Sequence, residues 1–292
     1  MTETVAGSPV IVGTAVVAPG MPAHDPVEIL GRRGLRYKDE ATRLGMAATQ
    51  SAFRDAGIAD CSGAVTAVIV SSNFGNLDTV CRIVGDHIGP GERSPMDLPN
   101  ASSNVVASSI AIRFGLFGPN LMLCSGANSG LDAVDWATVL LGSDRAARVV
   151  VVGVEVSNAV VRRFAPARAA SGLFHGAACL VIERADPAIR PPRAVVGACA
   201  RGRAGIESLV ATAVNRWYTP DFGAAGELAR VVNTPETVDL AARFGAASGA
   251  LGVLQAAYAA NRPGRSLLTT GGGDTEPAAC LITSKIATTA GE

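Results

Sequence analysis

The sequence is short of lysine, histidine and aromatic residues, and it has no excess charge of either sign. Of its 292 residues, 4% are aromatic and 17% are charged, and Lys+Arg and Asp+Glu both total 25. Without a basic excess, nucleic acid and acidic surfaces are not expected partners. The hydrophobic share of 48% and the mean hydropathy of +0.30 exclude a disordered chain. The scarcity of lysine, present only as Lys38 and Lys285, beside many arginines is typical of a GC-rich bacterial source.

Long uninterrupted apolar runs are also missing. The stretch from Met1 to Met21 has an apolar segment, but no basic residue precedes that segment and glycine and proline interrupt it. No other stretch has the apolar length that a membrane-spanning helix needs. We therefore expect a cytoplasmic protein whose first apolar segment is a β-strand.

The cysteines lack the spacing of a metal site or of a disulfide framework. No two of them form a Cys-x-x-Cys pair, and none has a histidine beside it. The sequence predicts no metal ion, no bound cofactor and reduced, mostly buried thiols. The six cysteines are Cys61, Cys81, Cys124, Cys179, Cys199 and Cys280.

Strand and helix patterns alternate along the chain, which indicates an α/β protein built in layers. Residues 39–57 predict a helix that carries Leu44, Ala48 and Ala52 on one face and ends at Gly57. Apolar, β-branched runs predict strands at residues 8–17, 64–73, 147–157 and 177–185.

A segment rich in proline and arginine, residues 184–194, precedes a second series of elements. The similar order on both sides predicts two pseudo-duplicated halves, residues 1–186 and 187–292, although no direct sequence repeat is visible. The second half is predicted to contain a strand at 194–200, helices at 206–214 and 246–260, and strands at 266–270 and 278–284.

The segment GPNLMLCSGANSGLDAVDWA, from Gly118 to Ala137, has the pattern of a strand, a turn of small residues and a helix. Asp132 and Asp135 lie in the first turns of that helix, where its dipole favours negative charge. Such a turn can expose a nucleophile and lower the pKa of a thiol. The same spacing is also found in an ordinary strand-turn-helix connection that has no catalytic role.

Several segments, given at the end of this paragraph, resemble the β-ketoacyl synthase family of the thiolase fold, most closely between Ser94 and Glu183. The resemblance implies a five-layer α/β/α/β/α core with two stacked mixed sheets. The chain is short for the family, which implies that its cap loops are trimmed. The segments are RLGMAATQSAFRDAGI, SPMDLPNASSNVVASSIAIRFGLFGPN, CSGANSGLDAV, RVVVVGVE, SGLFHGAACLVIE and GAASGALGVLQAA.

The residues that would carry catalysis in this family are replaced. An alignment on Gly118-Pro119 and Ser129-Gly130 places the family's acyl-accepting cysteine at Ala127. The family's catalytic lysine and second histidine align with two further alanines, and its first histidine loop aligns with RVVNTPETVD, which has no histidine. Decarboxylative condensation needs such imidazoles to stabilise the developing oxyanion. The resemblance therefore implies a degenerate site at Ala127, Ala241 and Ala246.

The remaining histidines and Cys124 do not restore this chemistry. His175 replaces an acidic residue of a family turn and is expected to be structural, whereas His24 and His87 are expected in solvated loops. No histidine follows His175. An alignment shifted by three residues would instead make Cys124 the nucleophile.

A ketosynthase-like chain without its nucleophile resembles a chain-length factor, and the segment VVASSIAIRFGLFGP resembles that group locally. The resemblance implies a subunit without catalytic activity of its own that pairs with an active ketosynthase in a type II polyketide or fatty-acid-like synthase, where acyl carrier protein holds the growing chain. Alanine departs from the glutamine common in chain-length factors.

The resemblance also implies a tunnel and an interface. Small side chains on the helix expected at residues 100–115 imply an open channel for a long or rigid acyl chain such as a polyene, although the same residues also suit tight helix packing. The channel residues would be Ser102, Ser103, Val105, Val106, Ser109 and Ile110. The strand expected at the dimer interface contains Asn120, Leu121, Met122, Leu123 and Cys124.

Two alternatives stay open. The chain could be a thiolase-fold acyltransferase or cyclase that uses Cys124, Ser125 or Ser129, although no general base is evident. It could also be a stand-alone pseudo-enzyme that binds an acyl or aromatic ligand.

Overall fold

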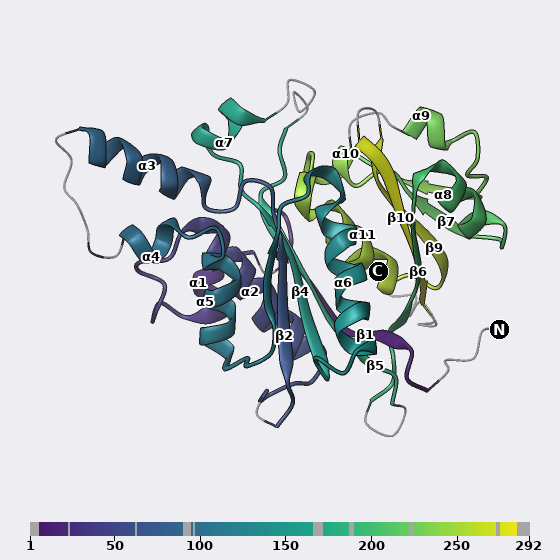
Figure 1. Ribbon diagram of the computed structural model, residues 1–292, viewed down its shortest axis with the longest axis horizontal. Coiled ribbons are helices and arrows are strands. Elements are labelled where there is room, and N and C mark those ends of the chain that lie inside the picture. The colour runs from purple at the N-terminus through teal and green to yellow at the C-terminus, as the bar shows by residue number, and fades with distance from the viewer. Residues whose placement is uncertain are drawn as a thin grey trace.

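Ten strands form one mixed sheet at the centre of the computed structural model (Figure 1). The structure describes residues 6–22, 24–61, 63–89, 95, 97–165, 172–186, 190–221, 225–272 and 275–284. Ser94, Lys285 and residues 187–189 of the predicted linker lie outside these ranges. The strands are β1 Pro9–Val17, β2 Thr66–Ser71, β3 Asn120–Leu123, β4 Arg148–Glu155, β5 Gly176–Arg184, β6 Ala194–Arg201, β7 Arg216–Tyr218, β8 Glu236–Val238, β9 Gly264–Gly272 and β10 Thr275–Ser284.

Helices cover this sheet and connect its strands. Two of them, α6 and α11, each follow a short 3₁₀ turn, η1 Gly126–Asn128 and η3 Ser248–Ala250. The helices are α1 Pro26–Leu30, α2 Glu40–Asp55, α3 Leu77–Ile88, α4 Asp97–Ala101, α5 Val105–Phe114, α6 Ser129–Gly142, α7 Ala159–Phe164, α8 Gly202–Val210, α9 Ala225–Leu228, α10 Ala241–Phe244 and α11 Leu251–Ala260.

The strand order occurs twice. The first five strands are arranged β3-β2-β4-β5-β1, and the last five, counted from the other edge, are arranged β8-β7-β9-β10-β6. In each set the third strand along the chain is at the edge and the first is innermost. Among the described residues, two β-sheet pairs join the sets, Val10 with Val195 and Ile11 with Ala194, so the two expected sheets are continuous at β1 and β6. The boundary at residues 186 and 187 stays a prediction.

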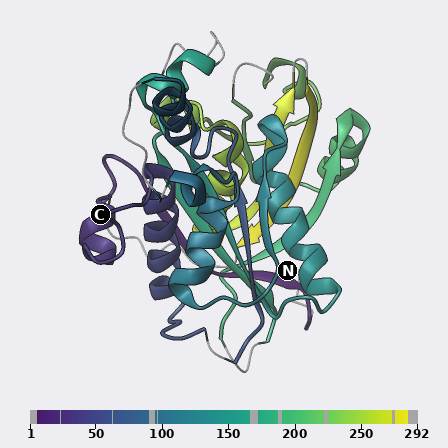
Figure 2. The same cartoon turned by 60° about the vertical axis from the view of Figure 1, so that its left-hand side comes forward.

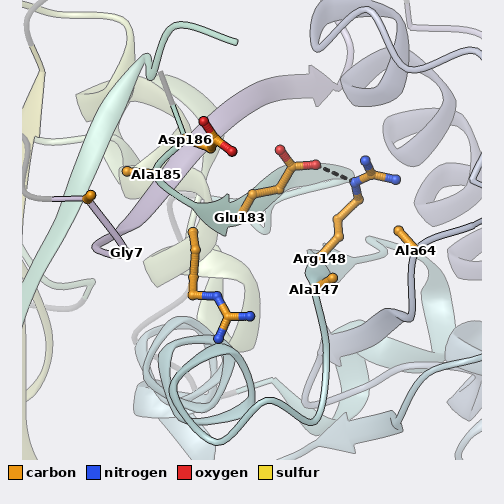
Figure 3. Close-up of a pocket in the computed structure, with 9 residues that line it drawn as sticks. Gly7, Ala64, Ala147, Arg148, Glu183, Ala185 and Asp186 are labelled. Carbon is orange, nitrogen blue, oxygen red and sulfur yellow. Dashed lines mark hydrogen bonds and ion pairs between the residues drawn. The ribbon is translucent and has the colours of Figure 1, made fainter. Parts of the chain in front are cut away.

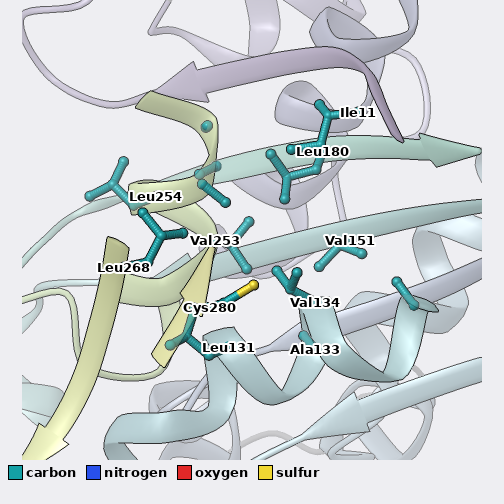
Figure 4. Close-up of a cluster of buried hydrophobic side chains, with 14 of the residues drawn as sticks. Ile11, Leu131, Ala133, Val134, Val151, Leu180, Val253, Leu254, Leu268 and Cys280 are labelled. Atoms are coloured by element: carbon teal, nitrogen blue, oxygen red, sulfur yellow. The ribbon is translucent and has the colours of Figure 1, made fainter. Parts of the chain in front are cut away.

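The buried side chains sort into layers, and the predicted thiolase-like α/β fold is confirmed. Along β4, Val149 and Val151 face α6 and α11, whereas Val150 and Val152 face α2 and α5, as the alternation of a strand requires. The α6 and α11 layer packs between the two strand sets, and Figure 4 shows side chains from both helices meeting there. A third cluster joins α8 to the outer face of the second set. The order of layers is therefore α/β/α/β/α.

Glycines let α6 and α11 cross closely. A Cβ on Gly130 would lie 2.6 Å from the backbone nitrogen of Gly252, and a Cβ on Gly252 would lie 2.4 Å from that of Leu131. Only glycine fits at such a backbone contact. The crossing fixes the position of the turns that begin both helices.

Several elements differ from those expected. The helix expected through residues 100–115 is interrupted between α4 and α5, and α8 begins and ends earlier than the predicted 206–214. The strands β7 and β8 and the helix α3 were not predicted, and His87 lies in α3 rather than in a loop. Helix α3 has no buried residue and projects beside α4 and α7 at the upper left of Figure 1, on the side that Figure 2 turns toward the viewer.

Within the described residues, no helix has both the length and the apolar character needed to cross a membrane. In the same part of the chain, no group of three or more His, Cys, Asp or Glu side chains is arranged to hold a metal ion. All six cysteines are free thiols; Cys61, Cys179 and Cys280 are buried, and Cys124 is exposed.

Candidate functional site

A pocket of about 320 Å³ lies beside Ala127, where both strand sets contribute residues. The turns after β2 and β7, the turns η1 and η3, and the ends of β9 and β10 all meet there. The pocket is therefore built by segments far apart in the sequence. Its lining residues are Asn73, Phe74, Gly126, Ala127, Phe164, Asp221, Ser248, Leu251, Gly271, Gly272 and Thr275.

Hydrogen bonds from Asn73 hold the turn that carries Ala127. Its side-chain amide nitrogen donates to the Gly126 carbonyl oxygen over 3.0 Å and to Ser248 Oγ over 2.7 Å. Ser129 Oγ donates to Asn73 Oδ1 over 3.1 Å. Gly126 has φ of +73°, in the left-handed region that favours glycine. This geometry places a methyl group, and no nucleophile, on the pocket wall at residue 127.

Cys124, the other candidate nucleophile, lies outside the pocket. Its Sγ lies 3.7 Å from the Asn73 carbonyl oxygen, and the residue is not among those that line the pocket. Partial burial of the thiol, and secondly the nearby Glu155 carboxylate, raise the pKa of Cys124 above its ordinary 9.0. Since the thiolate is the reactive form, this environment disfavours nucleophilic attack.

The serines of the turn have structural partners. Ser125 Oγ donates to Asp132 Oδ2 over 2.6 Å, and Asp132 also pairs with Arg201. Ser129 is fully buried; its Oγ lies 2.8 Å from the Gly126 carbonyl oxygen and accepts the Ser125 N–H over 2.7 Å. Neither hydroxyl has an imidazole partner among the described residues. A serine nucleophile would thus lack the base that activates it.

His175 lies apart from this pocket. Its Nδ1 accepts the backbone N–H of Ser157 over 3.2 Å, and its Nε2 lies 3.6 Å from Glu40 Oε1. The ring connects the start of α2 with the segment after β4. These contacts are those of a positioning side chain in the fold.

A buried carboxyl group organises the turn after β2. Glu155 accepts hydrogen bonds from the backbone N–H groups of Asn73, Phe74 and Gly249 and from the hydroxyl of Ser72. Burial nevertheless raises the pKa of Glu155 to about 7. The group therefore ties the two strand sets together directly behind the pocket.

Asp221 was not predicted as a site residue, yet it lines the pocket immediately after β7. Its Oδ2 accepts the backbone N–H of Ser248 over 2.7 Å, whereas its Oδ1 is buried without a hydrogen-bond partner. Burial, the dominant cause, raises the pKa of Asp221 to about 6. The signal in the sequence would have been an acidic residue next to the Thr219-Pro220 turn.

The other two degenerate positions do not line the pocket. Ala241 begins α10, and Ala246 is buried and forms an isolated bridge with Leu173. Only Ala127 of the three lies on the pocket wall. The correspondence of Ala241 and Ala246 with catalytic residues stays a prediction.

The predicted channel residues divide into a buried group and an exposed group. Val105, Val106, Ser109 and Ile110 are buried, and the side chains of Val106 and Ile110 lie against Gly45 of α2. Ser109 Oγ accepts a hydrogen bond from Lys38 Nζ over 2.9 Å. Ser102 and Ser103 are exposed between α4 and α5. Their role as a channel stays a prediction.

A larger cavity of about 570 Å³ lies at the opposite ends of β4 and β5. Arg148 Nε lies 2.6 Å from Glu183 Oε1, as Figure 3 shows, and Arg190 Nε lies 3.6 Å from the other oxygen of Glu183. Arg184 pairs with Asp144. These paired charges hold strand ends together, away from Ala127.

The repeated strand order, the crossing of α6 and α11, and the pocket at the start of α6 define a mixed α/β protein of the thiolase-like ketosynthase type. Residues 29–175 match the family described as "Beta-ketoacyl synthase, N-terminal domain". The chain belongs to the β-ketoacyl synthase family.

Curated relatives are similar over part of their length. The chain is 23% identical over 190 residues to 3-oxoacyl-[acyl-carrier-protein] synthase 2 of Coxiella burnetii. The matched region covers 56% of this chain and 46% of the relative. It is 28% identical over 141 residues to the Vibrio harveyi protein of the same name, and this match covers 46% of this chain and 33% of the relative. The matched regions thus span less than half of these two relatives.

Solved structures agree in fold along almost the whole chain. "The ishigamide ketosynthase/chain length factor" superposes with a TM-score of 0.74 at 23% identity, covering 95% of this chain and 99% of the other. A type II PKS acyl-carrier protein in complex with its ketosynthase superposes with a TM-score of 0.71 at 13% identity. The match covers 96% of this chain and 100% of the other. At these identities the likeness shows the fold.

Proposed function

We propose that this chain is a chain-length-factor-like subunit without catalytic activity of its own, which pairs with an active ketosynthase and shapes the tunnel for the acyl chain. The observation that carries this proposal is Ala127 on the pocket wall, at the turn where the family alignment expects the acyl-accepting cysteine. No cysteine or histidine is among the described lining residues. An acyl-enzyme needs a nucleophile, and condensation needs an acid or hydrogen-bond donor at the oxyanion.

The edge strand β3 offers a surface for the partner. It pairs with β2 alone among the described strands, so its other edge presents unpaired backbone groups. The flanking helices α5 and α6 expose large apolar side chains: Ile112 is 82% exposed, and Trp136 and Val139 are about half exposed. Phe117, just before β3, is 93% exposed. Exposed apolar side chains on the helices beside an open strand edge are typical of a subunit interface.

Helix α3 adds a second unpaired apolar face. Leu77, Val80, Cys81, Val84 and Ile88 recur at helical spacing, yet none of the residues of α3 is buried. Ile88 is 82% exposed. Residue Asn76 at its start donates hydrogen bonds to the carbonyl oxygens of Asn100 and Ser102. The start of α3 thus adjoins the exposed channel candidates, where a partner would complete the tunnel.

The solved neighbours support a role in polyketide assembly. One is named a ketosynthase/chain length factor, and another is a ketosynthase in complex with a type II PKS acyl-carrier protein. We infer the same kinds of partner for this chain: a catalytic ketosynthase and an acyl chain held by carrier protein.

Co-expression with an intact ketosynthase from the same gene neighbourhood tests this proposal. We expect the two chains to co-purify as a heterodimer and the complex, but not the isolated chain, to extend an acyl thioester. A matched charge variant of the interface, Phe117→Asp, should dissociate the pair, whereas Tyr37→Asp, also at an exposed aromatic residue, should not. A well-behaved isolated monomer that catalyses extension would contradict the proposal.

A further inference from the structure

One carboxylate oxygen of Asp221, in the pocket, has no hydrogen-bond partner among the described residues. Asp221 is only 9% exposed, and its Oδ1 is buried without a hydrogen bond, although its Oδ2 is held by the Ser248 N–H. A buried carboxyl oxygen left unsatisfied is costly, and native structures rarely keep one without a role. This oxygen is therefore an unused hydrogen-bond acceptor at the pocket wall.

The lining around Asp221 has the composition of a small-molecule site. Phe74, Phe164, Leu251 and Ala127 supply apolar surface, and Asp221 is the one ionisable side chain among the described lining residues. A volume of about 320 Å³ suits a small ligand. An acidic group in a mostly apolar pocket favours a ligand without negative charge.

Ser248 supplies a second polar contact beside the carboxyl group. Its Oγ accepts a hydrogen bond from Asn73 Nδ2 over 2.7 Å, and its own O–H has no acceptor among the described residues. Its φ of +47° is rare for a residue other than glycine, and the Asp221 carboxylate holds its backbone N–H. Backbone strain of this kind is concentrated at ligand sites. Donor and acceptor thus lie together at one end of the pocket.

We propose that this pocket binds a small molecule with an apolar body and an amine or hydroxyl head, and that the head donates to Asp221 Oδ1. A primary amine fits best because its positive charge neutralises the buried carboxylate. Repulsion from Asp221 weakens the binding of carboxylate ligands of the same size. The site goes beyond the partner role, and it binds whether or not the chain pairs with a ketosynthase.

Binding of matched probes tests this inference. Benzylamine, benzyl alcohol and benzoate share one ring and differ in the head group. Their affinities are measured by ligand-observed NMR and calorimetry at pH 7.5, on the full chain and, if it co-purifies, on the complex. We expect benzylamine to bind at least about tenfold more tightly than benzoate, with benzyl alcohol between them.

Two isosteric variants locate the effect. Asp221→Asn keeps an acceptor for the Ser248 N–H, and should reduce the preference for benzylamine over benzoate to within about threefold. Asp239→Asn removes the same charge at an exposed carboxylate nearby and should keep the preference. Failure of all three probes to bind, equal affinities for amine and carboxylate, or a preference unchanged by Asp221→Asn would overturn the inference.

Discussion

The side-chain amide of Asn73 donates a hydrogen bond to the carbonyl oxygen of Gly126 over 3.0 Å, which ties the turn after β2 to the turn that carries Ala127. The same amide reaches Ser248 in the second strand set. One side chain thus holds together three segments of the pocket that lie far apart in the sequence.

Replacing Asn73 should loosen all three segments at once. Asn73→Ala removes its bonds with Gly126, Ser248 and Ser129, and we expect a loss of about 1–3 kcal/mol in the free energy of unfolding. Urea denaturation measures it. Asn104→Ala, which removes a side-chain hydrogen bond with Asn120 outside the pocket, is the control. Binding of a pocket ligand, measured on both variants, should be altered by Asn73→Ala and unaltered by Asn104→Ala. Equal effects of both variants on such binding would argue against this role of Asn73.

The glycines at the crossing of α6 and α11 should not tolerate alanine. Gly130→Ala would bring a Cβ to 2.6 Å from the backbone of Gly252, so the helices must separate. We expect a loss of roughly 2 kcal/mol or more, in the range of overpacked cores. Gly142→Ala at the end of the same helix meets nothing within 4 Å and should be neutral or slightly stabilising. Thermal unfolding of both variants measures the difference, and equal melting temperatures would refute the close crossing.

Stability should fall as pH rises through the range in which two buried carboxyl groups ionise. Burial raises the pKa of Glu155 from 4.5 to about 7 and that of Asp221 from 3.8 to about 6. The folded chain therefore holds protons that the unfolded chain has already released. The stability that comes from this difference is fully present below the pKa values of the unfolded chain. It is lost as pH rises through the pKa values of the folded chain.

Asp221→Asn isolates one part of this dependence. Its free energy of unfolding relative to the natural chain should increase between pH 4 and 7, because asparagine has no proton to lose. Denaturation at several pH values within this window gives the slope. A variant whose pH profile runs parallel to that of the natural chain would show that Asp221 does not contribute.

The predicted channel is best tested at its exposed residues. Val106 is fully buried against α2, so Val106→Phe should overpack the core and cost about 1–3 kcal/mol. Ser102→Phe is exposed and should fold normally. In a complex with an active ketosynthase, we expect Ser102→Phe to shorten the product while the heterodimer still assembles, as measured by mass spectrometry of the products. An unchanged product distribution would place the tunnel elsewhere.

Elements with a strong local pattern were predicted correctly. Helix α2 has an Asp39 cap and buries Leu44, Ala48 and Ala52, and β4 is a run of buried valines, so periodicity alone defined them. Strand β7 has only three residues, too few for any period to show, and its position depends on pairing with β8 and β9.

The pocket was only partly predictable, because it is formed by segments that lie far apart in the sequence. The turn at Ala127 was found from its small residues and from the family resemblance. Asp221 joins it only because the second strand set packs beside the first, and an acidic residue after the Thr219-Pro220 turn does not by itself reveal that contact. Helix α3 was missed although its apolar residues recur at helical spacing; within this chain that face packs against no core.

A thiol placed at residue 127 tests separately whether the pocket can present a nucleophile and whether it can catalyse condensation. Ala127→Cys should react with iodoacetamide, because residue 127 lines the pocket, yet should not condense acyl and malonyl groups, since no imidazole lines the pocket in the described chain. Condensation by this variant alone would show that other residues supply the acid and base.

The most direct test of the proposed role is the intact mass of each chain after the co-purified complex has been incubated with an acyl thioester. We predict that the ketosynthase partner gains the acyl mass and that this chain, with alanine at position 127 and Cys124 outside the pocket, keeps its own mass. An acyl adduct on this chain, at Cys124 or at a serine of the turn, would contradict the account.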